Sequence, residues 1–214
     1  FLQGTINNYV GMKKNGPTEK SRQQELLIGP WSHLDKSFPL FGNMCGDEEF
    51  GLEAAWYMMD MEGILLKWFD KWLKNDGGDV NEYPVKIFVM GENKWRNEKE
   101  WPLKRTQYVN YYFHSNGNAN SNMTEGILNT TLPQSEPTDR YAYDPMNPVP
   151  TIGGSLCCDT THMPGGPYDQ RSLESRNDVL IYTTETLTED IEVTGRIIIN
   201  LWASSSALDT DFTG

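Results

Sequence analysis

The residue in this sequence that is best suited to catalysis is His33. It follows an apolar run at residues 26–28, which has the length of a short buried strand, and a Gly29-Pro30 pair, which predicts a turn. We therefore expect His33 on a loop at the carboxyl end of a strand, the edge at which open α/β sheets hold their functional side chains. An imidazole there can act as the general base that activates a serine hydroxyl, which is a poor nucleophile on its own.

The sequence shows no serine suited to such a base. The G-x-S-x-G pattern of a nucleophile elbow does not occur in the 214 residues. Ser32 adjoins His33, but adjacent side chains rarely point the same way, and no strand-turn-helix pattern surrounds Ser32. We interpret Ser32 as a locally hydrogen-bonded residue, so the sequence predicts a base without its nucleophile.

The other candidates for catalysis or metal binding have simpler interpretations. His114 and His162 lie in polar surroundings, and we predict that both are exposed loop histidines. Asp209 and Asp211 are spaced like a pair of calcium ligands, but the further oxygen ligands of a loop site are missing. No H-x-x-x-H or C-x-x-C pattern is present. We therefore expect no metal and no cofactor.

The cysteines do not form a disulfide framework. There are three, and two of them, Cys157 and Cys158, are adjacent. This usage favours a reducing compartment, so we expect a cytoplasmic location. A nucleophilic cysteine is the alternative interpretation, but the sequence places no histidine partner beside the pair, which favours ordinary thiols.

The acidic composition narrows the range of partners. With a formal net charge of −12 and an isoelectric point near 4.6, the chain would be repelled by nucleic acid and by anionic membranes. No apolar run approaches the roughly 18 residues that a membrane-spanning helix needs. We therefore expect neither nucleic acid nor membrane as a partner, and the sequence leaves a homo-oligomer open.

The elements that would position His33 belong to an α/β arrangement. We predict a helix from residue 1 to about residue 12, a strand over residues 85–90, and a long helix from Asp47 to about Asn75. Asp47 would cap that helix, and apolar residues recur along it at steps of three and four, which predicts burial over much of its circumference. Gly63 inside it would mark a close packing contact or a bend.

The pattern changes near residue 104. Candidate strands at 108–113, 127–132, 179–184 and 190–202 are separated by turn-forming residues, and no helical period persists. This pattern is typical of a β-sandwich, of which only part is visible, since a jelly roll closes with about eight strands. We therefore predict two domains: an α/β domain over residues 1–104 and an incomplete β-sandwich over residues 105–214.

Several blocks of sequence resemble the cocaine esterase / X-Pro dipeptidyl-peptidase family of serine hydrolases. In chain order these blocks are GPWSH, KIFVMGENKWR, EWPL, YDPMNPVPTIGG, DQR, DVLIYTTETL, DIEVTG and SSSALDTDFT. The resemblance implies that residues 1–104 are the C-terminal part of an α/β-hydrolase domain and that residues 105–214 are an incomplete jelly roll. It implies hydrolysis of small-molecule carboxylic esters or of amides such as X-Pro peptides through an acyl-enzyme, with His33 as the base. It also implies that the chain begins just after the catalytic Trp-Tyr-Asp turn, so that Asp35 is a loop residue and the serine lies upstream.

The resemblance further assigns residues to a substrate pocket. Phe1 matches the aromatic residue that lines the acyl pocket in the family, and Cys157 and Cys158 stand where the cocaine esterase-like members have a Leu-Phe pair that reaches over the active site. Arg171, in the DQR block, is expected to pair across the domain junction. The α-amino-acid ester hydrolase branch remains open. The alternative from another class is a non-catalytic β-sandwich binding module, against which residues 1–104 argue.

Overall fold

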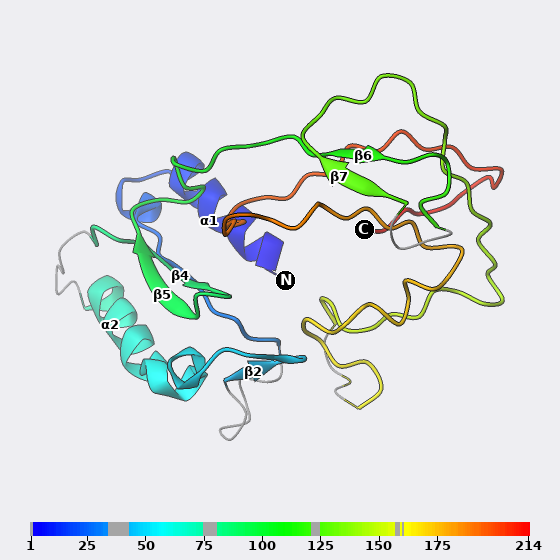
Figure 1. Cartoon of the computed structure of the whole chain (residues 1–214). Coiled ribbons are helices and arrows are strands. Elements are labelled where there is room, and N and C mark those ends of the chain that lie inside the picture. Colours follow the sequence, from blue (N-terminus) through cyan, green and yellow to red (C-terminus); the bar gives the residue numbers. More distant parts are fainter. Residues whose placement is uncertain (1, 34–42, 75–80, 121–124, 157–158, 160) are drawn as a thin grey trace.

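The computed structural model describes residues 2–33, 43–74, 81–120, 125–156, 159 and 161–214. Its helices, including the short 3₁₀ turns labelled η, are α1 (Leu2–Asn15), η1 (Lys20–Arg22), η3 (Leu52–Ala54), η4 (Trp56–Met59) and α2 (Met61–Leu73). Its strands are β1 (Leu26–Ile28), β2 (Met44–Cys45), β3 (Glu48–Glu49), β4 (Val85–Val89), β5 (Lys94–Glu98), β6 (Tyr112–His114) and β7 (Ile127–Asn129). Small sheets and few helices make up this β-rich structure (Figure 1).

The sheet that carries the His33 loop has the strand order β1-β4-β5. β1 and β4 run parallel, with Leu26 opposite Val85 and Ile28 opposite Ile87. β5 then pairs antiparallel with β4. Both predicted strands, at 26–28 and 85–90, are confirmed, and their parallel pairing places their carboxyl ends at the same edge of the sheet.

Helix α1 covers this sheet through a small apolar cluster. Tyr9 of α1 is buried against Leu26, Val85 and Ile87, and Trp101 packs at the margin of the cluster. The predicted N-terminal helix is therefore confirmed, and it supplies the core beneath β1. The packing fixes β1 and with it the starting point of the loop that leads to His33.

The predicted long helix is wrong in its first half. Helix α2 begins at Met61, and the side chain of Asp60, rather than that of Asp47, caps it by accepting a hydrogen bond from the Gly63 backbone N–H at 3.2 Å. Asp47 instead lies in the turn between β2 and β3. Gly46 in this turn has φ +59°, and Gly51 beyond it has φ +81°, conformations that a right-handed helix does not contain.

Helix α2 is also more exposed than its apolar pattern predicts. Met61 is its buried residue, whereas Leu66, Phe69 and Leu73 are exposed, the last by 77%. Gly63 does mark a close contact, because a Cβ there would collide with the Asp60 carboxylate. Within the described part of the chain, no element covers the outer face of the helix.

Residues 105–214, which contain strands but no helix among their described residues, form the β-rich half of the chain. This half is built around β6 and β7, which pair antiparallel. A third extended segment runs parallel to β7, where the Leu128 N–H donates to Thr183 O at 2.9 Å and the Thr183 N–H donates to Gly126 O at 3.1 Å. The predicted strands at 108–113 and 127–132 are thus present in shortened form, and the strand at 179–184 is reduced to one bridge.

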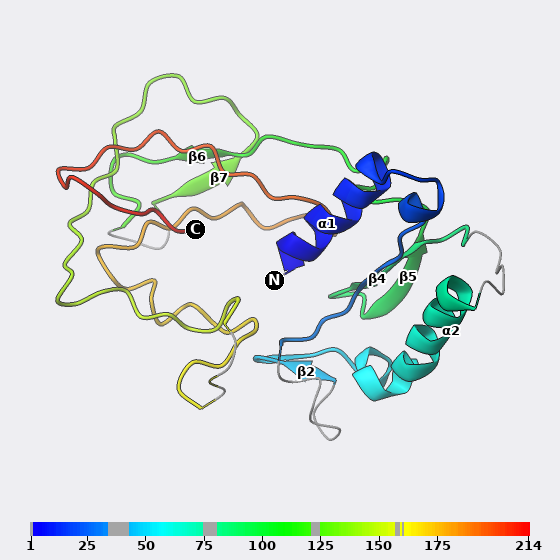
Figure 2. The same cartoon turned by 180° about the vertical axis from the view of Figure 1, so that it is seen from behind.

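The predicted strand over residues 190–202 is not formed. Among the described residues it has no ladder of backbone hydrogen bonds, and apolar side chains such as Ile197 and Trp202 are exposed. β-branched residues favour extended backbone, but a strand also requires a neighbour that accepts and donates its backbone hydrogen bonds. The segment runs extended past β6 and β7 in both views of the molecule (Figures 1 and 2).

Candidate active site

His33 lies in a turn after β1, at the carboxyl edge of the parallel pair β1 and β4, and its side chain is exposed. Residues 29–33, drawn in blue in Figure 1 and Figure 2, leave the sheet and run toward β2. The local geometry therefore agrees with a loop histidine at a strand end. This is the place from which a side chain can face a site built above the sheet.

Trp31 anchors this loop to the rest of the fold. Its indole Nε1–H donates to the Ala54 carbonyl oxygen at 2.6 Å, and Ala54 itself is fully buried. The ring of Trp31 meets Trp56 edge-on at 5.0 Å between centroids and lies tilted against Trp95 at 5.6 Å. Two residues before His33, the chain is therefore held by one hydrogen bond and two aromatic contacts.

Gly29 makes this placement of Trp31 possible. A Cβ built on Gly29 would lie 2.5 Å from three atoms of the Trp31 ring, closer than side chains approach one another. The ring thus folds back over the bare backbone of Gly29. The Gly-Pro-Trp sequence acts as a local unit in which the glycine leaves space for the ring and the proline restricts the turn.

A second loop, from the β-rich half, is anchored close to β2. Its base is closed by Gly154 and Gly166, whose backbones exchange hydrogen bonds of 2.7 and 3.0 Å. Gly166 lies against Gly46 and Cys45, since an added Cβ would be 3.0 Å from the Cys45 Sγ. This loop, drawn in yellow, lies beside β2 in Figure 1. The base of this loop is therefore fixed on the β2–β3 hairpin.

The contact between that hairpin and the loop continues through Asp47. The Asp47 N–H donates to Pro167 O at 2.8 Å, and its side-chain Oδ2 accepts from the Asp169 N–H at 3.0 Å. A cavity of about 460 Å³ adjoins this contact, lined by Asp47, Glu48, Pro167, Tyr168, Asp169 and Arg171. Its lining is largely polar.

Arg171 does not pair across the domain junction as expected. Its guanidinium binds the Asp169 carboxylate two residues earlier, with Nε at 2.8 Å from Oδ2, and both side chains are exposed. These hydrogen bonds lower the pKa of Asp169 to about 2. A local pair satisfies the guanidinium without a partner from the other half of the chain.

The remaining predicted site residues, Phe1, Cys157 and Cys158, lie outside the described residues, as does Asp35. Of the predicted site, the structure therefore places His33 and the base of the loop that contains the two cysteines. His162, on the same loop, has an 80% exposed side chain with Nδ1 3.1 Å from Asp159 Oδ2, as predicted for an exposed loop histidine.

The prediction for His114 is wrong. Its side chain is only 15% exposed, and both ring nitrogens are engaged: Nδ1 is 2.7 Å from Glu136 Oε1 and Nε2 is 2.9 Å from Thr131 O. The hydrogen bond to Glu136 raises the pKa of His114. This histidine joins β6 to the chain around residues 131–136 and takes a structural role.

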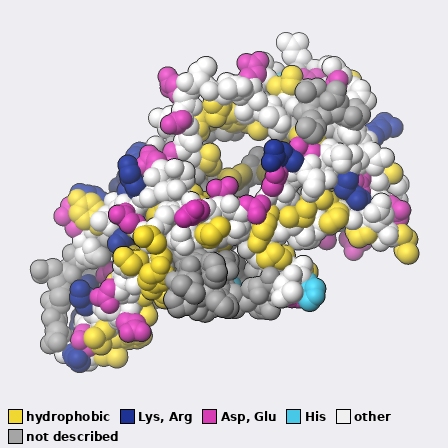
Figure 3. All heavy atoms as spheres, turned by 60° about the horizontal axis from the view of Figure 1, so that its bottom comes forward, with side chains coloured by type: hydrophobic (Ala, Val, Ile, Leu, Met, Phe, Trp, Pro, Cys, Tyr) yellow, Lys and Arg dark blue, Asp and Glu magenta, His cyan; other side chains and the backbone are white. Residues whose placement is uncertain are grey.

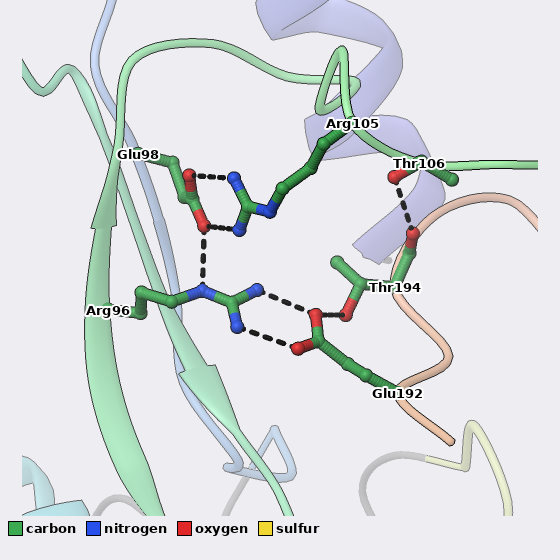
Figure 4. A network of polar contacts seen from close by, with 6 residues as sticks. All are labelled: Arg96, Glu98, Arg105, Thr106, Glu192 and Thr194. Carbon is green, nitrogen blue, oxygen red and sulfur yellow. Dashed lines mark hydrogen bonds and ion pairs between the residues drawn. The ribbon is translucent and has the colours of Figure 1, made fainter. Parts of the chain in front are cut away.

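Sequence reasoning also missed a charged network that links the two halves of the chain (Figure 4). Arg96 on β5 binds Glu192 with both terminal nitrogens at 2.7 Å, and its Nε donates to Glu98 Oε1 at 2.6 Å. Arg105 forms a second paired contact with Glu98, which is only 7% exposed. Arg96 and Glu98 share one face of β5, but a contact 96 residues away has no local signature.

Within the described ranges, no group of three or more His, Cys, Asp or Glu side chains is arranged to hold a metal ion. In the same part of the chain, every helix is too short or too polar to cross a membrane. Figure 3 shows Asp and Glu side chains spread over one face, with Lys and Arg side chains scattered among them.

Comparison with known proteins identifies similarity along the whole chain. Residues 79–213 match the family model of the X-Pro dipeptidyl-peptidase C-terminal non-catalytic domain, a match that starts before β4 and leaves His33 outside. The cocaine esterase of Rhodococcus sp. (strain MB1 Bresler) is 37% identical over 217 residues, which cover 100% of this chain and 35% of that esterase. Two mycobacterial proteins provisionally named as serine esterases, from Mycobacterium bovis and Mycobacterium tuberculosis, are each 27% identical over 87% of this chain and 27% of their own lengths. The chain thus spans about a third of the length of these relatives.

Proposed function

Because the chain belongs to the cocaine esterase / X-Pro dipeptidyl-peptidase family, we propose that it works as part of a serine hydrolase that cleaves carboxylic esters or amides. In this proposal residues 1–104 are the C-terminal part of an α/β-hydrolase domain, and residues 105–214 belong to a jelly roll. The chain supplies the general base, His33. The nucleophilic serine and the carboxylate that orients the imidazole are assigned to the part of the relatives' length that this chain does not span.

The observation that carries the proposal is the extent of the esterase similarity. A non-catalytic binding module would account for a match confined to residues 79–213. The similarity to the cocaine esterase covers 100% of the chain, so it includes β1 and the loop that presents His33. The exposed position of His33 beyond the carboxyl end of β1 supports the same assignment.

The proposed chemistry follows from the properties of an imidazole. His33 would take the proton from the serine hydroxyl as its oxygen attacks the substrate carbonyl, and would then give that proton to the leaving alcohol or amine. The resulting acyl-enzyme would be hydrolysed by water, with His33 again removing a proton. Backbone or side-chain donors would stabilise the oxyanion in both steps.

The substrate class remains at the level of ester or amide. We propose Phe1, Cys157 and Cys158 as pocket residues, and the anchoring of the 153–166 loop on the β2–β3 hairpin supports an approach of that loop toward the His33 side of the sheet. Two cysteines in place of a Leu-Phe pair make a smaller and more polarisable lining. An aromatic acyl preference is therefore not carried over to this chain.

Replacing His33 in the full-length protein tests the proposal. With p-nitrophenyl acetate as the probe, His33→Ala should lower kcat by about 10³- to 10⁶-fold, since the members of a catalytic triad act as a unit. Lys104→Ala, which removes an exposed side chain outside both the His33 loop and the 153–166 loop, is the control and should leave kcat unchanged. Near-normal turnover by a folded His33→Ala protein would show that the base lies elsewhere.

A further inference from the structure

We propose that Trp31 is the positioning residue for His33: it fixes the loop so that the imidazole meets the serine in a reactive geometry. The inference rests on the proposed function, because it assigns to Trp31 the placement of the proposed base. It adds a specific residue through which the fold controls that base.

The argument begins with distance along the chain. Two peptide units separate Trp31 from His33, so their Cα atoms are at most about 7 Å apart. A displacement of the backbone at Trp31 therefore displaces His33 by a similar distance. A misplacement of about 1 Å at a catalytic group can lower the rate of reaction by about 100-fold.

The anchor itself is well suited to hold the loop. An indole has a single N–H donor, and in Trp31 this donor is used on the carbonyl of fully buried Ala54, at 2.6 Å. A hydrogen bond to a buried carbonyl does not exchange freely with water, and its loss would leave that oxygen unsatisfied. The contacts with Trp56 and Trp95 fix the plane of the ring.

The local sequence is adapted to this anchor. The close approach of the Trp31 ring to Gly29 leaves no room for a side chain at position 29. Glycine and tryptophan are therefore required together, for a reason that involves neither substrate nor serine. This explains why the histidine is preceded by a Gly-Pro-Trp unit rather than by an ordinary polar turn.

The same cluster contains a matched control. The Trp95 indole N–H also donates to a carbonyl of the adjoining turn, that of Glu53, at 2.8 Å. Trp95 shares the ring contact with Trp31, but it lies on β5 and is far from His33 in sequence. Phenylalanine keeps an aromatic ring at either position, so a ring at position 95 still packs against residue 31. Trp31→Phe and Trp95→Phe therefore each remove one indole donor from the same cluster, and only the first removes the hydrogen bond that holds the His33 loop.

The experiment compares four variants of the full-length protein on p-nitrophenyl acetate: Trp31→Phe, Trp95→Phe, His33→Ala and the Trp31→Phe/His33→Ala double variant. We expect Trp31→Phe to lower kcat by about 10- to 100-fold with little change in KM, and Trp95→Phe to leave kcat within about twofold. The double variant should be no slower than His33→Ala alone, because a base that is absent cannot be misplaced. Circular dichroism compares the folding of each variant.

The outcomes separate the two proposals. If His33→Ala keeps near-normal activity, the proposed function fails. The positioning role of Trp31 is wrong if His33→Ala is inactive but Trp31→Phe lowers kcat no more than Trp95→Phe does. It is also wrong if Trp31→Phe lowers the residual activity of His33→Ala by the same factor as it lowers the activity of the unmodified protein. Should Trp31→Phe not fold, 3-benzothienylalanine at position 31 keeps the ring volume and replaces only the N–H by sulfur, with the same expected result.

Discussion

At the scale of single residues, His114 shows how two contacts favour one charge state. Its ring nitrogens face the Glu136 carboxylate and the Thr131 carbonyl, and both of these groups accept hydrogen bonds. Both contacts are satisfied when both nitrogens donate, an arrangement that favours the protonated imidazole and agrees with its raised pKa. Glu136 also accepts from the Ser115 N–H, while the nearby Asp139 carboxylate opposes the charge on Glu136.

This arrangement predicts a pH-dependent clamp between β6 and the chain around residues 131–136. The hydrogen bond to Glu136 raises the pKa of His114, so its stabilisation is complete below the ordinary value of 6.5 and is lost as pH rises through the higher folded-state pKa. The same bond lowers the pKa of Glu136, so its contribution is present above 4.5 and is lost as pH falls. The His114–Glu136 contact should therefore stabilise the fold most between pH 4.5 and pH 6.5.

An NMR titration of the His114 ring protons tests this prediction. Its pKa should lie above 6.5 in the unmodified protein and fall in Glu136→Gln, where the charged acceptor is absent. Glu189→Gln removes one exposed carboxylate from the same half of the chain and serves as the charge control. An equal fall in both variants would mean that the general acidity of the chain, rather than the Glu136 contact, raises the pKa.

At the scale of elements, the sequence predicts those helices and strands whose positions depend on interactions between residues close together in the chain. Strands β1 and β4 and helix α1 were predicted because their apolar patterns and flanking turns agree with one another. The start of α2 was not, because Gly46 takes a left-handed conformation and the adjoining Asp47 backbone bonds Pro167, more than 100 residues later. The placement of His33 after a strand could be predicted. Its anchoring by Trp31 could not, since the acceptor lies 23 residues away.

The corrected start of α2 leads to a stability prediction. Asp60 occupies the left-handed region with φ +47° and caps the Gly63 N–H, so Asp60→Ala should lose the cap and leave a Cβ in an unfavourable conformation. We expect a loss of about 1–2 kcal/mol in the free energy of unfolding, measured by urea denaturation. Asp60→Asn, which still caps and tolerates this backbone, should stay within about 0.5 kcal/mol.

Asp70→Asn is the control for a change elsewhere on the same helix. It breaks an exposed pair with Lys74 at 2.7 Å, whose contribution should be about 0.5 kcal/mol or less. If Asp60→Ala were no more costly than Asp70→Asn, the cap at Asp60 would not set the beginning of α2.

At the scale of the whole molecule, the network around Arg96 holds the two halves of the chain together. Arg96 binds Glu98 on its own strand and Glu192 in the β-rich half, and Arg105, the first residue of the β-rich half, also binds Glu98 (Figure 4). Two guanidinium groups here face two carboxylates, so the network is neutral in a chain of net charge −12. Each charged group in this network needs its ion-pair partner. Without Arg96 and Arg105, the Glu98 carboxylate would be a buried, unpaired charge, which destabilises the fold.

Removing one charge from the junction tests its contribution to stability. The contact with Arg96, followed by that with Thr194, lowers the pKa of Glu192 to about 2. The stabilisation of the fold by ionised Glu192 is therefore present above pH 4.5, the ordinary pKa of a glutamate, and is lost as pH falls from 4.5 toward 2. Glu192→Gln should therefore lower the free energy of unfolding at pH 7 by about 1 kcal/mol, a figure discounted because the Glu192 side chain is 40% exposed. The difference from the unmodified protein should shrink at acidic pH, where Glu192 is protonated in both states.

Urea unfolding at pH 7 and at acidic pH measures this difference, and hydrogen exchange at residues 190–195 reports where it arises. Glu82→Gln, which breaks an exposed pair with Lys99, is the matched control and should affect neither stability nor exchange at that segment. Faster exchange at 190–195 in Glu192→Gln alone would show that the Arg96 contact holds this extended segment in place, where no strand pairing does so among the described residues. Unchanged exchange, or equal effects of the two variants, would mean that the halves are joined by the Asp47 and Pro167 contact and that the charged network only follows their docking.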